Sequence, residues 1–387
     1  MSKKIYLDYA ATTPLDKRVL KAMMSYLKEK FGNAMSFHLF GKETEKAVEK
    51  ARAQIADLLD ADPEEIFFTS GATESNNWAL RGLTKKGDHI ITSAIEHHSL
   101  KETAEALQKE GREVTFLKPE ENGVLALSKI QSAVRKNTKL ISIMFANNEV
   151  GTIQPIQKTG EWLKKENKNK KNKIYLHTDA AQALGYLNCS VKKLGVDLMS
   201  ISAHKIYGPK GIGGLYIKRG APIKNLLFGG EQEQGKRPGT HNVAGIVGFG
   251  EATRILIKER TKNAKKIKKL RDSLIKKVLK EIPHSSLNGS IKRRLPNNAN
   301  FSFKNVEGEG IVLGLSLKGI AVSTGSACTS GSLEPSHVLL AMGKGPLEAH
   351  GSLRISLGKY TTKKEIDVFI KELKKTIERL RKISPEL

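Results

Sequence analysis

Residues 174–214 read IYLHTDAAQALGYLNCSVKKLGVDLMSISAHKIYGPKGIGG and contain two runs that predict buried β-strands. The first run ends at an acid, Asp179, and the second is followed closely by His204 and Lys205. In an open α/β sheet, groups just past the carboxyl ends of strands line the ligand crevice. A carboxylate and an amine held there are costly to bury unless a ligand compensates them.

A pyridoxal phosphate site would use both of these groups. The ring nitrogen of this cofactor pairs with an anion, and its aldehyde reacts with a lysine. One lysine means little in a chain with 66 Lys and Arg residues, so a plain surface acid and amine are the alternative. The combination S-x-H-K followed by a Gly-Pro-Lys-Gly turn is much more specific. It favours pyridoxal phosphate between Asp179 and Lys205.

Length and composition exclude several classes of protein. A chain of 387 residues can bury a sizeable core and form two domains. No run approaches the ~18 apolar residues of a membrane span, and the start, MSKKIYLDYAATTP, lacks the apolar region of a signal peptide. Two cysteines, Cys189 and Cys328, cannot form a disulfide framework and suit a reducing cytoplasm.

The net charge of +26 raises the question of nucleic-acid binding. The lysines are spread along helical segments, and aromatic residues make up only 6% of the chain. No basic cluster is interleaved with stacking residues, as in proteins that bind single strands. We therefore interpret the charge as solvated helix faces and do not expect direct nucleic-acid binding as the main role.

Strand and helix patterns alternate along the chain, which argues for a mostly parallel sheet with crossover helices. Helices are expected at residues 42–59, 250–280, 308–317 and 362–381. Strands are expected at residues 66–69, 89–92, 114–117, 140–145, 174–178, 196–202, 213–217, 299–303, 320–323 and 353–357. The lysine-rich segment 164–173 predicts a solvent-exposed loop.

Three polar segments follow expected strands. Residues 70–76, SGATESN, form a small-residue turn into a helix whose N–H groups suit a phosphate, although a capping turn without a ligand is the commoner case. His97 could stack on a flat cofactor, but an exposed loop histidine is the better interpretation from local sequence. No ligands of matching spacing support a metal at His97 and His98. In the segment 147–151, NNEVG, the amides of Asn147 and Asn148 face the crevice or form a simple turn, and the residues leave this open.

The segment 323–332, STGSACTSGS, surrounds Cys328 with small residues only. Such a segment can hardly pack a core, so we expect residues 323–333 to form a mobile loop. A structural cysteine would lie among apolar residues and be inert. We interpret Cys328 as a reactive thiol that meets substrate at one site and delivers product at another, and Cys189 as structural.

These motifs together resemble the cysteine desulfurases of the NifS/IscS type, group I, within the class V aminotransferase-like family of pyridoxal-phosphate enzymes. The resemblance covers essentially the whole chain. It rests on motifs in the family's order: YLDYAATTP, FFTSGATESNN, NNEVGTIQP, HTDAAQ, SAHKIYGPKG, RPGTHN, VSTGSACTSGSLEPSHVL and SLRISLGKYTT. The form of the cysteine segment favours the group with a flexible arm over the selenocysteine-lyase-like group.

The resemblance implies an α/β protein of the PLP-dependent transferase fold type I. A large domain, residues 15–255, is expected to hold the cofactor on a mainly parallel seven-stranded sheet. A smaller α+β C-terminal domain is expected from residues 256–387 together with residues 1–14. The resemblance further implies a cytoplasmic homodimer with its active site at the subunit interface.

The reaction implied by the resemblance converts L-cysteine to L-alanine. Lys205 hands the cofactor to the substrate amine and moves the Cα proton, and the Cys328 thiolate attacks the substrate sulfur and becomes a persulfide. Asn148 and Arg354 hold the substrate, since a guanidinium grips a carboxylate with two bonds. The acceptor is an iron–sulfur scaffold protein or a tRNA-thiolation relay protein. No resident metal is expected, although Cys328 would contact an iron–sulfur cluster transiently during transfer.

The resemblance also assigns the cofactor contacts. His97, as a further catalytic residue, stacks on the ring, Asp179 pairs with the ring nitrogen, and Gln182 binds the ring hydroxyl. The other expected contacts are Ala72, Thr73, Asn148, Ser202, His204, Lys205 and, from the second subunit, Thr240.

Two positions depart from the family pattern, because Glu231 stands where a third glycine is common and Gln234 where an arginine is common. These departures bear on loop geometry and interface contacts. Other hypotheses are an aminotransferase or selenocysteine lyase of the same fold, and, from a different class, a non-enzymatic subunit of a sulfur-transfer complex or a basic nucleic-acid binder. Cys328 in its small-residue loop disfavours an aminotransferase. The joint presence of Lys205, Asp179 and Cys328 argues against the non-enzymatic alternatives, while selenocysteine lyase activity stays open.

Overall fold

The computed structural model describes residues 4–325 and 334–383. Its main feature is a seven-stranded sheet in the order β2-β8-β7-β6-β5-β3-β4. Only β8 runs antiparallel to its neighbours, and the other neighbouring strands are parallel. The strands are β2 (Ile66–Thr69), β3 (His89–Ser93), β4 (Glu113–Leu117), β5 (Thr138–Ser142), β6 (Tyr175–Asp179), β7 (Leu198–Ser202) and β8 (Gly213–Ile217). The expected mainly parallel α/β fold is confirmed.

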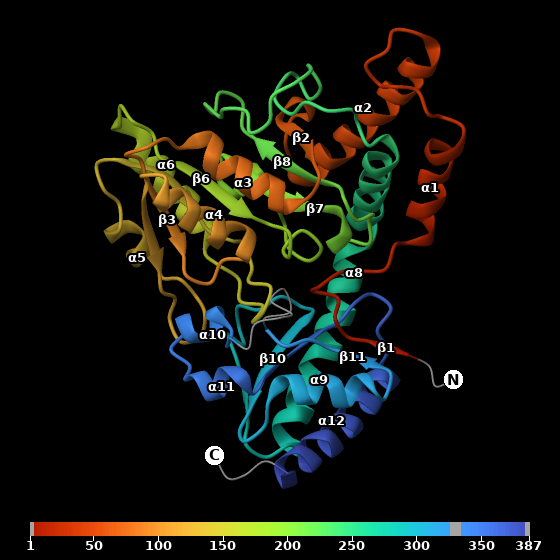
Figure 1. Cartoon of the computed structure of the whole chain (residues 1–387), viewed down its shortest axis with the longest axis vertical. Coiled ribbons are helices and arrows are strands. Elements are labelled where there is room, and N and C mark those ends of the chain that lie inside the picture. The colour runs from red at the N-terminus through yellow and green to blue at the C-terminus, as the bar shows by residue number, and fades with distance from the viewer. Residues whose placement is uncertain (1–3, 326–333, 384–387) are drawn as a thin grey trace.

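Helices cover both faces of this sheet (Figure 1). They are α1 (Lys17–Lys28), α2 (Leu39–Leu59), α3 (Ala72–Leu83), α4 (His98–Lys109), α5 (Leu127–Ser132), α6 (Ile156–Glu166) and α7 (Val191–Leu194). Because side chains alternate across a strand, successive residues enter different cores. Leu198 packs with Trp78 of α3, whereas Met199 packs with Ile55 of α2. Burial on both faces explains the nearly continuous apolar strands.

A second unit packs below the sheet (Figure 1). Its antiparallel sheet has the order β12-β10-β9, and β1 (Ile5–Tyr6) pairs in parallel with β11 (Ile320–Ala321). The other elements are β9 (Ser285–Leu287), β10 (Asn298–Phe303), α9 (Gly308–Ser316), α10 (His337–Ala341), α11 (Pro346–His350), β12 (Ser352–Ser356) and α12 (Lys363–Ile383). Its hydrophobic core includes Ile5, Phe301 and Phe369 and is separate from the cores of the large sheet.

One helix, α8 (Val243–Glu281), runs through both units (Figure 1). Phe249 near its start packs in the core of the large sheet, and Leu274 near its end packs in the core of the smaller unit. The two main cores support our proposal that residues 15–255 form one domain and that residues 1–14 and 256–387 form the other, and a small cluster joins Val338 and Leu339 of α10 to Ile95 and Met144 of the large unit.

The structure corrects several element boundaries. The strand expected at 140–145 lies at Thr138–Ser142, and the expected strand 320–323 is reduced to Ile320–Ala321, with Ser323 in an isolated bridge to Arg354. α8 begins seven residues before its expected start at 250, because the side chain of Asn242 caps it by accepting a hydrogen bond from the Gly245 N–H.

The expected loop 164–173 is wrong in its first part, where α6 continues to Glu166. Lysines in the last turn of a helix interact favourably with its dipole, and Lys164 and Lys165 occupy that turn. The sequence analysis did not predict α1 or β1, and β1 is only two residues long. Within residues 4–325 and 334–383, no helix combines the length and the apolar character needed to cross a membrane.

Core packing in the smaller unit gives a first prediction. Phe369 of α12 is fully buried, whereas its neighbour Val368 is 39% exposed. Phe369→Ala should lower the free energy of unfolding by about 3–5 kcal/mol, because it removes buried apolar area and leaves a cavity. Val368→Ala should change it by less than about 1 kcal/mol. Urea unfolding followed by circular dichroism would measure both, and equal effects would contradict the assigned packing.

Candidate active site

The carboxyl ends of β6 and β7 open into a cavity of about 460 Å³. The start of α3 and residues 11–12 of the N-terminal segment also line it. These predicted site residues meet in the cavity: Ala72, Thr73, His97, Asn148, Asp179, Gln182, Ser202, His204 and Lys205. The crevice at the strand ends is therefore where the sequence pattern placed it.

Asp179 is the last residue of β6, and its carboxylate is held by two donors. The side-chain amide of Asn76, on α3, donates to Oδ2 at 2.8 Å, and the Ala181 N–H donates to Oδ1 at 2.8 Å. The carboxylate is almost fully buried. Its orientation at the cavity is thus fixed before any ligand binds.

Lys205 ends the short 3₁₀ helix Ala203–Lys205 that follows β7. Its Nζ donates to the carbonyl oxygens of Ala10 and Ala11 at 2.6 and 2.7 Å. Gln182, in the turn after β6, donates to the same Ala10 carbonyl at 2.9 Å. The N-terminal segment therefore lies directly beside the amine and closes one side of the cavity.

The two cavity histidines are neutral at pH 7. His97 caps α4, and its Nδ1 accepts from the Ser99 N–H at 3.1 Å. Burial lowers the pKa of His97, although Asp179 opposes that change. Burial and the nearby Lys205 lower the pKa of His204 to about 4, and its Nδ1 lies 3.1 Å from the Thr12 hydroxyl. Uncharged imidazoles can stack on a ring or accept hydrogen bonds without adding charge.

Small residues and hydroxyls gather at the start of α3. Ala72 and Thr73 form its first turn, and Ser202, the last residue of β7, faces the same cavity. A Cβ at Gly213 would collide with the backbone of Gly71, so only glycine allows β8 to approach this turn. Backbone N–H groups at a helix start bind phosphate groups well.

Arg354 and Asn148 flank the cavity with polar atoms that lack a partner. Arg354 of β12 donates to the Asn148 carbonyl at 3.1 Å and to Asp8 Oδ1 at 2.9 Å. Its buried Nε, and the buried Oδ1 of Asn148, have no hydrogen-bond partner among the described residues. Other buried polar atoms of the described chain also lack partners, but Asn148 lines the cavity, so its Oδ1 is available to a ligand there. Arg354 does not itself line the cavity and is joined to it by its bond to Asn148.

Besides Arg354, the predicted site residues Cys328 and Thr240 fall outside this group. Cys328 and most of the expected loop 323–333 lie outside the described residues. Thr240 is exposed and does not line the cavity. Cys189 is fully buried, and burial raises the pKa of its thiol to about 12, which makes it inert at neutral pH. Within the described chain, no group of three or more His, Cys, Asp or Glu residues could hold a metal ion.

Some site residues were missed from sequence. Asn76, which orients Asp179, lies three residues after Thr73, and this helical spacing could have placed both on one face of α3. Thr12 and the carbonyls of Ala10 and Ala11 gave no local signal, because the N-terminus reaches the site only through tertiary contacts.

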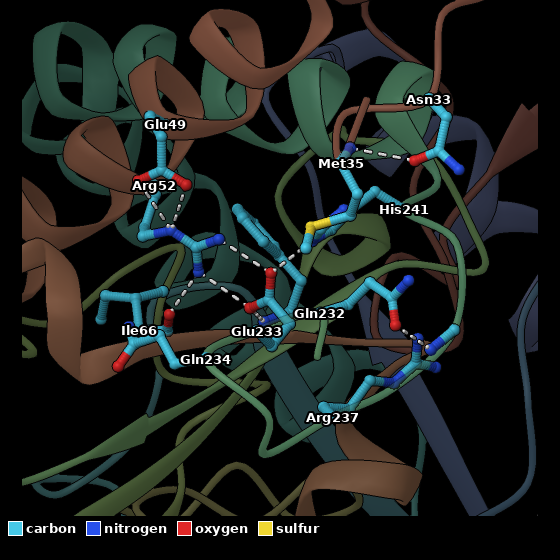
Figure 2. Close-up of polar contacts among 12 residues, drawn as sticks. Asn33, Met35, Glu49, Arg52, Ile66, Gln232, Glu233, Gln234, Arg237 and His241 are labelled. Atoms are coloured by element: carbon cyan, nitrogen blue, oxygen red, sulfur yellow. Dashed lines mark hydrogen bonds and ion pairs between the residues drawn. The ribbon is translucent and has the colours of Figure 1, made fainter. Parts of the chain in front are cut away.

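The segment before Thr240 is braced by a buried ion pair (Figure 2). Glu233 accepts from Arg52 at 2.7 and 2.8 Å, from the Phe68 N–H at 2.7 Å, and lies 2.8 Å from His241 Nε2. Burial alone would raise the pKa of Glu233, but the bonds from Arg52 and His241 lower it to about 2. The unusual Glu231 is exposed.

Comparison with known proteins identifies the family. The model of the class-V aminotransferase family matches residues 5–369. A cysteine desulfurase IscS of Dictyoglomus turgidum is 52% identical, over 100% of this chain and 97% of that protein. The mitochondrial cysteine desulfurase of Saccharomyces cerevisiae is 47% identical, over 99% of this chain and 77% of that protein. The chain belongs to the cysteine desulfurases of the class-V aminotransferase family.

Solved structures of such proteins have the same fold. A NifS-like protein matches with a TM-score of 0.90 at 41% identity, over 97% of this chain and all of that chain. SspA in complex with cysteine matches with a TM-score of 0.80 at 37% identity, over 93% of this chain and all of that chain. The expected family and the type I fold are confirmed.

Cysteine desulfurases use pyridoxal 5′-phosphate, as the sequence predicted, and the residues of the cavity fit it. The cavity offers an amine at Lys205, a fixed carboxylate at Asp179 and a helix start for the phosphate. The unsatisfied Oδ1 of Asn148 would gain a partner when a ligand is bound. The donor set and the size of the cavity therefore agree with this cofactor.

The brace on Asp179 gives a testable prediction. Asn76→Ala should raise the dissociation constant for pyridoxal phosphate about tenfold, because the carboxylate loses the donor that orients it. Equilibrium dialysis of the apoenzyme with the cofactor would measure this. The change Asn122→Ala, at an exposed amide, is the control. Unchanged affinity in Asn76→Ala would show that Asp179 needs no brace.

The buried Glu233 gives a pH-dependent prediction. Glu233→Gln leaves Arg52 buried without its main counter-charge and should lower stability at pH 7 by about 3–5 kcal/mol. The folded-state pKa of Glu233 is depressed to about 2, so its contribution is present above pH 4.5 and is lost as the pH falls toward 2. The difference in Tm between wild type and variant should shrink between pH 5 and pH 3. Glu231→Gln should show no such trend, and a constant difference would contradict the ion-pair assignment.

Proposed function

We propose that this enzyme removes sulfur from L-cysteine, yielding L-alanine and a persulfide on Cys328. The observation that carries the proposal is the pairing of Lys205 and Asp179 across one cavity, in a chain whose relatives are cysteine desulfurases. A structural relative was solved in complex with cysteine, which supports the same substrate here.

When bound, pyridoxal phosphate supplies the electron sink that makes the bond between Cβ and sulfur breakable. Lys205 anchors the cofactor, then serves as the base that moves the Cα proton of the substrate. Asp179, held by Asn76 and the Ala181 N–H, would present its carboxylate to the ring nitrogen. The ring of His97, which lines the same cavity, would stack on the cofactor ring.

The substrate carboxylate is assigned to Arg354. Two of its nitrogens bind Asp8 and the Asn148 carbonyl, which fixes the guanidinium plane. Its Nε has no partner among the described residues and remains to receive an anion. The thiolate of Cys328 then attacks the substrate sulfur, so that a sulfur–sulfur bond forms while the carbon–sulfur bond breaks.

We also propose a homodimer in which Thr240 contacts the phosphate bound by the partner. The support is the exposure of Thr240 together with a set of exposed apolar side chains, since large exposed apolar patches mark interaction sites. These are Phe31, Phe37, Leu39, Phe40 and Phe228, between 57% and 92% exposed. The persulfide acceptor is an iron–sulfur scaffold or a tRNA-thiolation relay protein, and a cytoplasmic location stays a prediction.

Single-turnover mass spectrometry tests the chemistry. After addition of L-cysteine, the holoenzyme should gain one sulfur on Cys328, matched by an equal amount of alanine. Lys205→Ala should lose the visible absorbance of the cofactor, whereas Cys328→Ala should keep it and lose sulfide release. Full activity of Cys328→Ala with cysteine would show that the thiol assignment is wrong.

Mixed dimers test the shared site. In a heterodimer of Lys205→Ala and Thr240→Ala subunits, one site combines an intact Lys205 with an intact Thr240 from the other chain. That site should regain the cofactor affinity that the Thr240→Ala homodimer loses. If Thr240 acts within its own subunit, no site is intact and affinity should stay at the Thr240→Ala level.

A further inference from the structure

Glu149 is a fully buried carboxyl group with no part in the chemistry above. It follows Asn148 in the loop after β5, and its side chain touches both borders of the segment 326–333. On one border, the Ser336 hydroxyl donates to Oε2 at 2.5 Å. On the other, Gly325 lies so close that a Cβ there would collide with the same Oε2.

The borders are also tied to the cavity by other contacts. Ser323 and Arg354 exchange backbone hydrogen bonds of 3.3 and 2.7 Å. The Ser336 hydroxyl that binds Glu149 also accepts from the Leu339 N–H and so caps α10. His337 Nε2 lies 2.9 Å from the Glu96 carbonyl. Both ends of the segment that carries Cys328 are therefore fixed on the strand ends that form the active site.

Glu149 is itself held rigidly. Its N–H donates to Asn147 Oδ1 at 2.8 Å, and its carbonyl accepts from Asn298 and Asn300 at 3.0 and 3.2 Å. The backbone groups of Glu149 are thus bonded elsewhere, and its side chain is the part that contacts Gly325 and Ser336. Burial raises the pKa of Glu149 to about 7, although Ser336 and Arg354 oppose that change.

We propose that Glu149 is a positioning residue for sulfur transfer, which sets where both ends of the Cys328 segment stand relative to the substrate. The inference rests on the proposed function. Cys328 is the third residue after Gly325, and three residues span about 10 Å at most. The position of Gly325 therefore limits where the thiol can reach. Since small displacements of a reacting group slow a reaction strongly, loosening this contact should slow the transfer of sulfur.

The first experiment separates substrate binding from sulfur transfer in the holoenzyme. We would measure Ser336→Ala and Glu149→Gln, with Ser316→Ala and Glu120→Gln at exposed sites as matched controls. Rapid-quench mass spectrometry gives the rate of persulfide formation on Cys328, and the change in cofactor absorbance with cysteine concentration gives substrate affinity. Both variants should form persulfide about tenfold more slowly, while substrate affinity stays within about twofold of wild type.

A second experiment tests the contact with Gly325 directly. Gly325→Ala should slow persulfide formation at least about tenfold, because its new Cβ meets the Glu149 carboxylate. The double variant Gly325→Ala with Glu149→Asp shortens that side chain and should recover part of the rate. Because residues in contact couple, relief of the clash would recover stability as well, so the rates are compared under conditions where urea unfolding shows every variant fully folded.

Two results would overturn the proposal. One is an unchanged persulfide rate in both Ser336→Ala and Glu149→Gln. The other is a loss of substrate affinity equal to the loss of rate, which would place Glu149 in the binding of substrate through Asn148 and Arg354. Failure of the proposed function would look different from failure of the Glu149 proposal, because the wild-type enzyme itself would then form no persulfide on Cys328.

Discussion

The contact between the Lys205 amine and the carbonyls of Ala10 and Ala11 joins the two units of this enzyme at its reactive centre. Five residues earlier, the same N-terminal segment pairs with β11 of the smaller unit. Thr13 extends the connection, because its hydroxyl donates to the His204 carbonyl and accepts from the Tyr207 N–H. The position of the lysine thus depends on a strand from the opposite unit.

Several charged side chains around the site form buried ion pairs. Arg354 meets Asp8, Arg52 meets Glu233, and Asp16 meets Lys359. Removing one partner of such a pair leaves a buried charge without compensation. This lowers stability far more than replacing both partners with apolar residues does. Each pair joins segments that are distant in sequence or, for Asp16, ties the N-terminal region to residue 359. These pairs therefore specify how the segments meet as well as stabilising the result.

Much of this could be predicted from the sequence because the signals are local. The buried strands, the acid at the end of β6 and the lysine after β7 are readable from apolar runs and their ends, and the motifs identified the family. Thr12, Asn76 and Glu149 were not assigned roles, because each acts through a partner that only the folded chain brings near. Local sequence also misjudged His97 as an exposed loop residue, because its place in the cavity depends on tertiary contacts.

The long helix α8 has a mechanical consequence. At 39 residues it is about 58 Å long, and it is anchored in the core of each unit. A continuous helix resists bending, since a sharp kink requires breaking its backbone hydrogen bonds. The helix therefore holds the two units at a nearly fixed distance from each other. This opposes the wide hinge closure that many two-domain enzymes use. Turnover in this enzyme therefore depends on short displacements of side chains and loops, while the distance between the two units stays nearly constant.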